Sequence, residues 1–150
     1  MYNYIPMVYW LPELIFLAQI FLAIILGGIL GLQREQRGKF AGPRTYALVT
    51  GGATLFTILS LNAFGDDIAR VASQILVGIG FLGAGMILHK ENRIDGLTTA
   101  AGIWMTAAIG MAVGVHYYIL AIGSTLLMYL VFIFNDERFK KNKDQKNDDN

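Results

Sequence analysis

The sequence predicts an all-α fold: a polytopic transmembrane bundle of five helices, with the N-terminus outside and the C-terminus in the cytoplasm. Of its 150 residues, 55% are hydrophobic and 15% are charged, whereas soluble domains carry about 25% charged residues. The apolar residues form five segments of about 18 or 19 residues, long enough to cross roughly 30 Å of hydrocarbon as helices. All 12 basic residues except Arg70 fall in alternate connections or in the tail. This asymmetry sets the orientation by the positive-inside rule.

We expect the spans at residues 14–32, 46–64, 71–88, 97–114 and 117–134. Thr50, Thr54 and Thr57 fall on one face of the second span, so their hydroxyls should face the bundle and bond to backbone or to a partner helix. Residues 1–134 therefore form one transmembrane domain. Residues 135–150 are almost without apolar side chains, which predicts a disordered cytoplasmic tail.

Glycines are concentrated in the third and fourth spans. Gly78, Gly80 and Gly83 form the pattern GxGxxG, but they lie inside an apolar segment without the strand and turn that a phosphate-binding loop requires. In a bilayer, glycines let helix backbones approach closely. We therefore predict helix packing by six glycines: Gly78, Gly80, Gly83, Gly85, Gly110 and Gly114. The GxxxG pairs Gly27–Gly31 and Gly110–Gly114 could serve packing within the chain or a homo-oligomer.

Two connections on the predicted cytoplasmic side are highly charged, GLQREQRGKFAGPRT and HKENRIDGLTTA. The basic residues of the first could simply fix the topology. Alternatively, the connection forms an ordered polar cap that docks against the second connection or a partner protein. In the second connection, Asp95 could cap the next helix and favour its dipole. We expect the two connections to lie side by side.

Several function classes lack their usual residues. The chain has no cysteine, and the spans contain no Asp, Glu, Lys or Arg, which transporters usually place along an interior pathway. No HExxH, nucleophile elbow or P-loop occurs, so we predict neither an enzyme nor a cofactor. The acidic pair Asp66 and Asp67 offers too few ligands for a metal site. A net charge of +1 argues against nucleic-acid binding.

Three blocks, GLQREQRGKFAGPRTYALVT, GIGFLGAGMI and GLTTAAGIWMTAAIGMAVG, resemble the signature blocks of the MgtC/SapB family of bacterial inner-membrane proteins. The resemblance implies a membrane domain linked to growth in low magnesium and to virulence. It implies a regulator that contacts other inner-membrane proteins, such as the ATP synthase or a cation transporter; the alternative is a magnesium or other cation transporter. It nominates a functional surface of nine residues: Arg34, Glu35, Arg37, Arg44, Thr45, Glu91, Gly96, Thr98 and Thr99. Gln33 stands where family members often carry an acidic residue.

Overall fold

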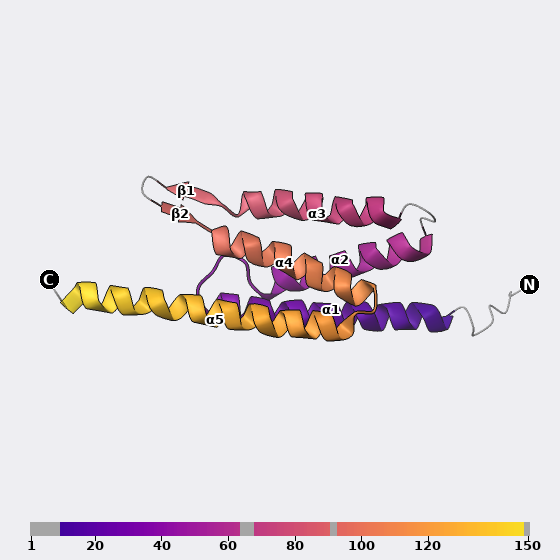
Figure 1. Ribbon diagram of the computed structural model, residues 1–150, viewed down its shortest axis with the longest axis horizontal. Helices are drawn as coiled ribbons and strands as arrows, with labels where there is room; N and C mark the ends of the chain where they lie inside the picture. Colours follow the sequence, from indigo (N-terminus) through magenta and orange to yellow (C-terminus); the bar gives the residue numbers. More distant parts are fainter. Residues whose placement is uncertain (1–9, 64–67, 91–92, 149–150) are drawn as a thin grey trace, which may run out of the picture.

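Five helices and one short hairpin make up the computed structural model (Figure 1). It describes residues 10–63, 68–90 and 93–148, and the side-chain environments within 10–63, 69–89 and 94–133. The helices are α1 (Trp10–Gln36), α2 (Pro43–Ala63), α3 (Ile68–Gly85), α4 (Leu97–Gly114) and α5 (Tyr118–Asp148). Strands β1 (Leu88–Lys90) and β2 (Arg93–Asp95) pair antiparallel between α3 and α4.

The helices run alternately up and down, so the charged connections gather at one end of the bundle. At that end lie the α1–α2 connection, the hairpin and the C-terminal half of α5, which extends beyond the bundle (Figure 1). The start of α1 and the α4–α5 turn lie at the opposite end. Helices α1, α2 and α4 pack together at the centre, α5 lies along α1 and α4, and α3 packs outside α2 and α4. Leu30, Ile103 and Val113 are fully buried in this core.

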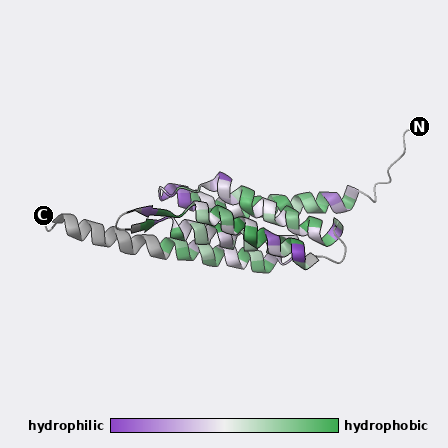
Figure 2. Ribbon diagram, turned by 90° about the horizontal axis from the view of Figure 1, so that it is seen from above, coloured by the Kyte–Doolittle hydropathy of each residue, from purple (hydrophilic) through white to green (hydrophobic). Residues whose placement is uncertain are grey.

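The all-helical prediction is confirmed, together with the presence of five helices. Helices α1, α2 and α4 are each long and apolar enough to cross a membrane. In α3 and α5 the apolar stretches are shorter, at Ala69–Gly85 and Tyr118–Ile133. Helices α1 to α4 and the first part of α5 are mostly hydrophobic (Figure 2). Five membrane crossings and the orientation of the termini stay predictions.

Two parts of the chain differ from the sequence-based expectation. The second charged connection forms the β1–β2 hairpin, with His89 opposite Ile94. Asp95 ends β2, and Gly96 is the N-cap of α4. Asp95 therefore lies just before the helix, as predicted, but it is not the N-cap residue. The favourable effect of its charge on the helix dipole stays a prediction. The backbone of α5 continues as a helix through Asp148, where the sequence predicts a disordered tail. The Glu, Lys and Gln residues of this segment have high helix propensity, so an established helix extends through them at little cost.

The threonine face of α2 points into the bundle, as predicted. Thr50, Thr54 and Thr57 are buried, and each hydroxyl donates to the backbone carbonyl of the preceding turn at 2.7–2.9 Å. The Thr54 hydroxyl also lies 2.8 Å from the carbonyl oxygen of Gly110 in α4. The threonines therefore place hydroxyls between helices without leaving them unsatisfied.

Glycines bring α1, α2 and α4 into contact at backbone distance. A Cβ at Gly27 or Gly110 would collide with α2 backbone, and one at Gly31 would collide with Pro43. At Gly114 it would lie 2.7 Å from the Thr57 Cβ. The two GxxxG pairs thus serve packing within this chain.

The glycines of α3 behave differently. No atom of another part of the described chain lies within 4 Å of a Cβ built at Gly78, Gly80 or Gly85, and Gly83 makes only an ordinary contact with Ala100 at 3.7 Å. The glycines of α3 therefore do not bring this helix into close contact with its neighbours, contrary to the prediction. The reason is the outer position of α3, since most of its surface faces away from the other helices.

Candidate functional site

The most unusual residue of the bundle is Arg34, whose side chain is only 2% exposed. It lies in the last turn of α1, which ends in a Schellman motif with Gly38 in the left-handed conformation (φ 65°). In this motif the amide of Gly38 donates to the carbonyl of Glu35 at 2.9 Å, and that of Lys39 donates to the carbonyl of Arg34 at 3.0 Å. The glycine thereby turns the chain away from the helix, while the Arg34 side chain points inward.

Three other helices supply the surroundings of Arg34. Its Nη2 lies 3.4 Å from the Oγ1 of Thr99 in α4 and can donate to it. Its guanidinium carbon is 4.3 Å from the ring centroid of Phe132 in α5, which is cation–π geometry. Tyr46 of α2 meets the Phe132 ring edge-on, with centroids 6.4 Å apart. The hydroxyl of Tyr46 interacts electrostatically with Arg34, although it makes no hydrogen bond of standard geometry.

We call Arg34, Tyr46, Thr99 and Phe132 the Arg34 cluster. The cluster ties α1, α2, α4 and α5 together at the end of the bundle that carries the charged connections (Figure 1). An arginine suits this position because its planar, weakly hydrated group can stack on a ring and donate sideways at once.

The space for this cluster depends on Gly102 of α4. A Cβ there would lie 2.5 Å from the Tyr46 hydroxyl oxygen and 2.9 Å from the Cζ of Phe132. Because both aromatic side chains occupy the volume that any larger residue would need, Gly102 fixes where they can sit. Because Gly102 has no side chain, α5 can approach α4 closely beside Arg34.

Gln33, the residue before Arg34 in α1, adds a buried amide to the same turn of the helix. It is 5% exposed, and both of its amide atoms are buried and make no hydrogen bond within the described part of the chain. Buried polar atoms in proteins are normally paired with protein or with water. The Gln33 amide therefore has capacity for a further polar partner.

A second feature, at the surface, combines predicted residues of the first connection. Glu35, Arg44 and Thr45 line an open polar pocket of about 460 Å³, together with Gly42 and Pro43. The pocket forms because α2 starts at Pro43, beside the last turn of α1. The two segments are close there, since a Cβ built on Gly42 would lie 3.4 Å from the Oε1 of Glu35. Carboxylate, guanidinium and hydroxyl groups are thus presented together to solvent.

The structure brings some of the nominated residues together and separates others. Arg34 and Thr99 meet inside the bundle, which joins the first connection to the start of α4. Arg37 and Thr98 are exposed. Gly96 has φ 90° at the start of α4, with the Met86 carbonyl where a Cβ would be, so its role is conformational. Glu91 lies outside the described residues, as do Asp66 and Asp67.

Sequence reasoning missed Tyr46, Phe132 and Gly102. Tyr46 and Phe132 stand at the ends of predicted spans, where aromatic residues are common at the membrane interface. Gly102 is one of many glycines. To recognise their role from the sequence, one would have had to know that Arg34 is buried over the Phe132 ring.

These features present groups that can bind a polar or charged partner. Within residues 10–63, 69–89 and 94–133, no group of three or more metal-ligating side chains occurs. The Arg34 cluster holds one cation against aromatic and hydroxyl groups, and the surface pocket presents both signs of charge. Such features suit the positioning of helices and contact with polar or charged partners.

An apolar helical bundle whose charged groups gather at its ends is typical of a helical membrane protein. A model of the MgtC family matches residues 20–140. The chain belongs to the MgtC family.

Named relatives agree with this assignment. The chain is 42% identical over 135 residues to "Putative magnesium transporter YhiD" of Escherichia coli K12, covering 83% of this chain and 63% of that protein. It is 41% identical over 106 residues to protein MgtC of Salmonella typhimurium 14028s, covering 71% of this chain and 46% of that protein. The chain thus spans less than two thirds of the length of these relatives. No solved structure matches it.

Proposed function

We propose that this protein crosses the bacterial inner membrane several times and modulates magnesium or ion homeostasis, or membrane energetics, through contacts with other membrane proteins. The role is regulatory and non-enzymatic. Its N-terminus lies outside and the charged connections face the cytoplasm, in accordance with the positive-inside rule. Membership of the MgtC family supports the link to magnesium.

The observation that carries the proposal is the tight closure of the interior. Gly27, Gly31 and Gly110 hold α1 and α4 against α2 so closely that a single added methyl would collide. The hydroxyls of Thr50 and Thr54, which face this interior, are taken up by backbone carbonyls. A pathway for a hydrated cation needs polar groups that are available along a cavity. A packed interior instead favours action through the outer surface.

The surface suited to such contacts is the end with the charged connections. Arg37, Lys39 and Arg44 are exposed there beside Glu35. Phe40 is 75% exposed among them. Exposed aromatic and arginine side chains are enriched where proteins contact one another.

Copurification with charge-reversal variants tests this role. The tagged protein and an Arg37→Glu variant are extracted from bacterial membranes in mild detergent, and bound proteins are identified and confirmed by reciprocal capture. Arg70→Glu is the matched control, because Arg70 is exposed at the opposite end of the bundle. We expect Arg37→Glu to reduce capture of a specific membrane protein severalfold and Arg70→Glu to leave it unchanged. Equal capture by all three proteins would contradict the proposed surface.

The alternative function is transport of magnesium or another cation. The name of the relative YhiD, which contains the words "magnesium transporter", favours it. The two functions differ in whether the purified protein alone moves Mg²⁺ across a bilayer, which a flux measurement decides.

A further inference from the structure

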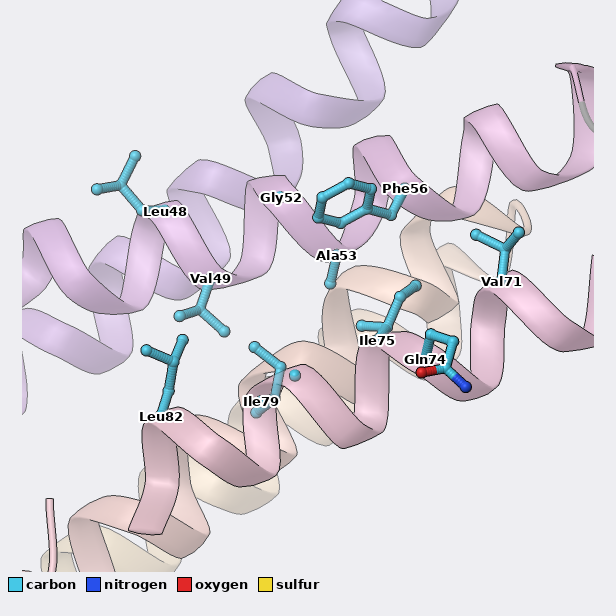
Figure 3. A pocket seen from close by; sticks show the side chains of 11 residues that line it. Leu48, Val49, Gly52, Ala53, Phe56, Val71, Gln74, Ile75, Ile79 and Leu82 are labelled. Carbon is cyan, nitrogen blue, oxygen red and sulfur yellow. The ribbon is translucent and has the colours of Figure 1, made fainter. Parts of the chain in front are cut away.

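An apolar groove opens between α2 and α3, away from the Arg34 cluster. It has a volume of about 600 Å³ and is lined by Val49, Phe56, Ile75, Ile79 and Leu82, among others. Figure 3 shows these side chains facing one another across the gap between the two helices. Gln74 is the one polar side chain in the lining.

Two glycines create this space. Gly52 of α2 and Gly78 of α3 both line the groove, and within the described residues no atom of another part of the chain lies within 4 Å of a Cβ built at either position. Gly78 belongs to the GxGxxG pattern, yet it neither binds phosphate in a turn nor packs against a helix. Its missing side chain leaves a slot on the outer surface of the bundle.

The groove is open along its outer side and apolar along its length. From Leu48 to Phe56 it follows α2 for roughly 12 Å, since a helix rises about 1.5 Å per residue. An apolar groove of this length can hold a stretch of an extended acyl chain. A helix of a partner or of a second copy seated there would keep lipid out of the groove, so the labelling experiment below separates the two occupants.

The charge at one mouth of the groove indicates what kind of chain enters. Arg44 precedes Leu48 by four residues, which places it on the same face of α2, one turn beyond the groove. It is exposed and lies at the end of the bundle with the charged connections (Figure 1). Glu35 shares its pocket, but Arg37 and Lys39 leave this connection net positive. The N-terminus of α2 adds the positive end of a helix dipole.

We propose that the α2–α3 groove binds an acyl chain of an anionic phospholipid whose phosphate lies over Arg44. Lipid tails are as apolar as the groove, so the acyl chain contributes shape fit and no hydrophobic drive. The preference for an anionic headgroup then comes from Arg44. This inference rests on the proposed membrane placement, and it specifies a lipid ligand that the proposed regulatory role does not itself require.

Photolabelling tests the site. The protein is reconstituted in phosphatidylcholine vesicles that contain phosphatidylglycerol with a photoactivatable diazirine in one acyl chain, and labelled peptides are mapped by mass spectrometry. We expect labelling of residues 49–56 and 71–82 to exceed severalfold that of the exposed α5 surface around Leu126 and Leu130. Gly78→Leu fills the groove and should abolish this excess. Gly80→Leu is the matched control, because Gly80 is also open but does not line the groove.

The headgroup is tested with the same vesicles. Arg44→Gln should lower the preference for labelled phosphatidylglycerol over equally labelled phosphatidylcholine about fivefold, as expected for one basic residue near a membrane surface. Even labelling of the groove and α5, equal effects of the Gly78 and Gly80 variants, or an unchanged preference in Arg44→Gln would each overturn the proposal. If the protein does not lie in the membrane as proposed, neither α5 nor the groove would be labelled. This result differs from even labelling of both, which contradicts only the lipid site.

Discussion

Replacing Gly110 by alanine tests the closed interior at its tightest point. The new Cβ would meet the Thr50 carbonyl oxygen and lie 3.0 Å from the Ala53 Cβ. Both neighbours belong to α2 close to its backbone, so relief requires α2 and α4 to separate. Overpacking of this kind costs about 1–3 kcal/mol, and loss of the hydrogen bond from Thr54 adds about 0.6 kcal/mol. Because alanine gains about 1 kcal/mol in helix propensity over glycine, we expect a net loss of about 0.6–2.6 kcal/mol.

Equilibrium unfolding in mixed micelles measures this loss, with SDS as denaturant and the fluorescence of Trp10 and Trp104 as signal. Gly80→Ala is the control, because it gains the same helix propensity while its new Cβ has no neighbour within 4 Å. It should be as stable as the unmodified protein or up to about 1 kcal/mol more stable. If the Gly110 and Gly80 variants unfold at the same SDS fraction, α2 and α4 do not pack as described.

Three further substitutions test other contacts in the same assay. Arg34→Lys keeps the charge but loses the planar group over the Phe132 ring, so we expect a loss of about 1–2 kcal/mol; unchanged stability would argue against the cation–π contact. Thr54→Val removes the interhelical hydroxyl contact at nearly constant volume and should cost about 0.6–1.5 kcal/mol, more than Thr50→Val, whose hydroxyl bonds within its own helix. In Gly96→Ala the alanine would have to adopt φ 90° with its Cβ against the Met86 carbonyl, so the free energy of unfolding should fall by about 1–3 kcal/mol. Unchanged stability would show that residue 96 does not have this backbone conformation at the start of α4.

The helical segments and the threonine face could be predicted from the sequence because both depend on local pattern. An apolar run of sufficient length has few alternatives to a helix in a membrane. The spacing of Thr50, Thr54 and Thr57 puts them on one face whatever the other helices do. Predictions of this kind need no knowledge of the tertiary arrangement.

The burial of Arg34 could not be predicted in this way. An arginine at the end of an apolar segment ordinarily marks the lipid–water boundary. Here the burial depends on Thr99 and Phe132, which lie 65 and 98 positions further along the chain, and on the space left by Gly102. The sequence nominated Arg34 and Thr99 but gave no indication of their aromatic partners.

Glycine spacing was equally ambiguous. Gly78 and Gly110 both belong to small-residue patterns, but one lines an open groove and the other contacts the Thr50 backbone. What separates them is the position of the helix, since α3 lies outside and α4 lies at the centre. The hairpin also escaped prediction, because strands of three residues are too short to show an alternating pattern.

Magnesium flux through the purified protein tests the proposed regulatory role most directly. Vesicles that contain the protein and a trapped Mg²⁺-sensitive dye are exposed to an external Mg²⁺ gradient, with an ionophore added at the end to establish the full signal. A closed interior predicts that entry of Mg²⁺ does not exceed entry into protein-free vesicles. Entry that increases with the amount of protein and saturates with Mg²⁺ concentration would contradict the regulatory role and favour the transporter.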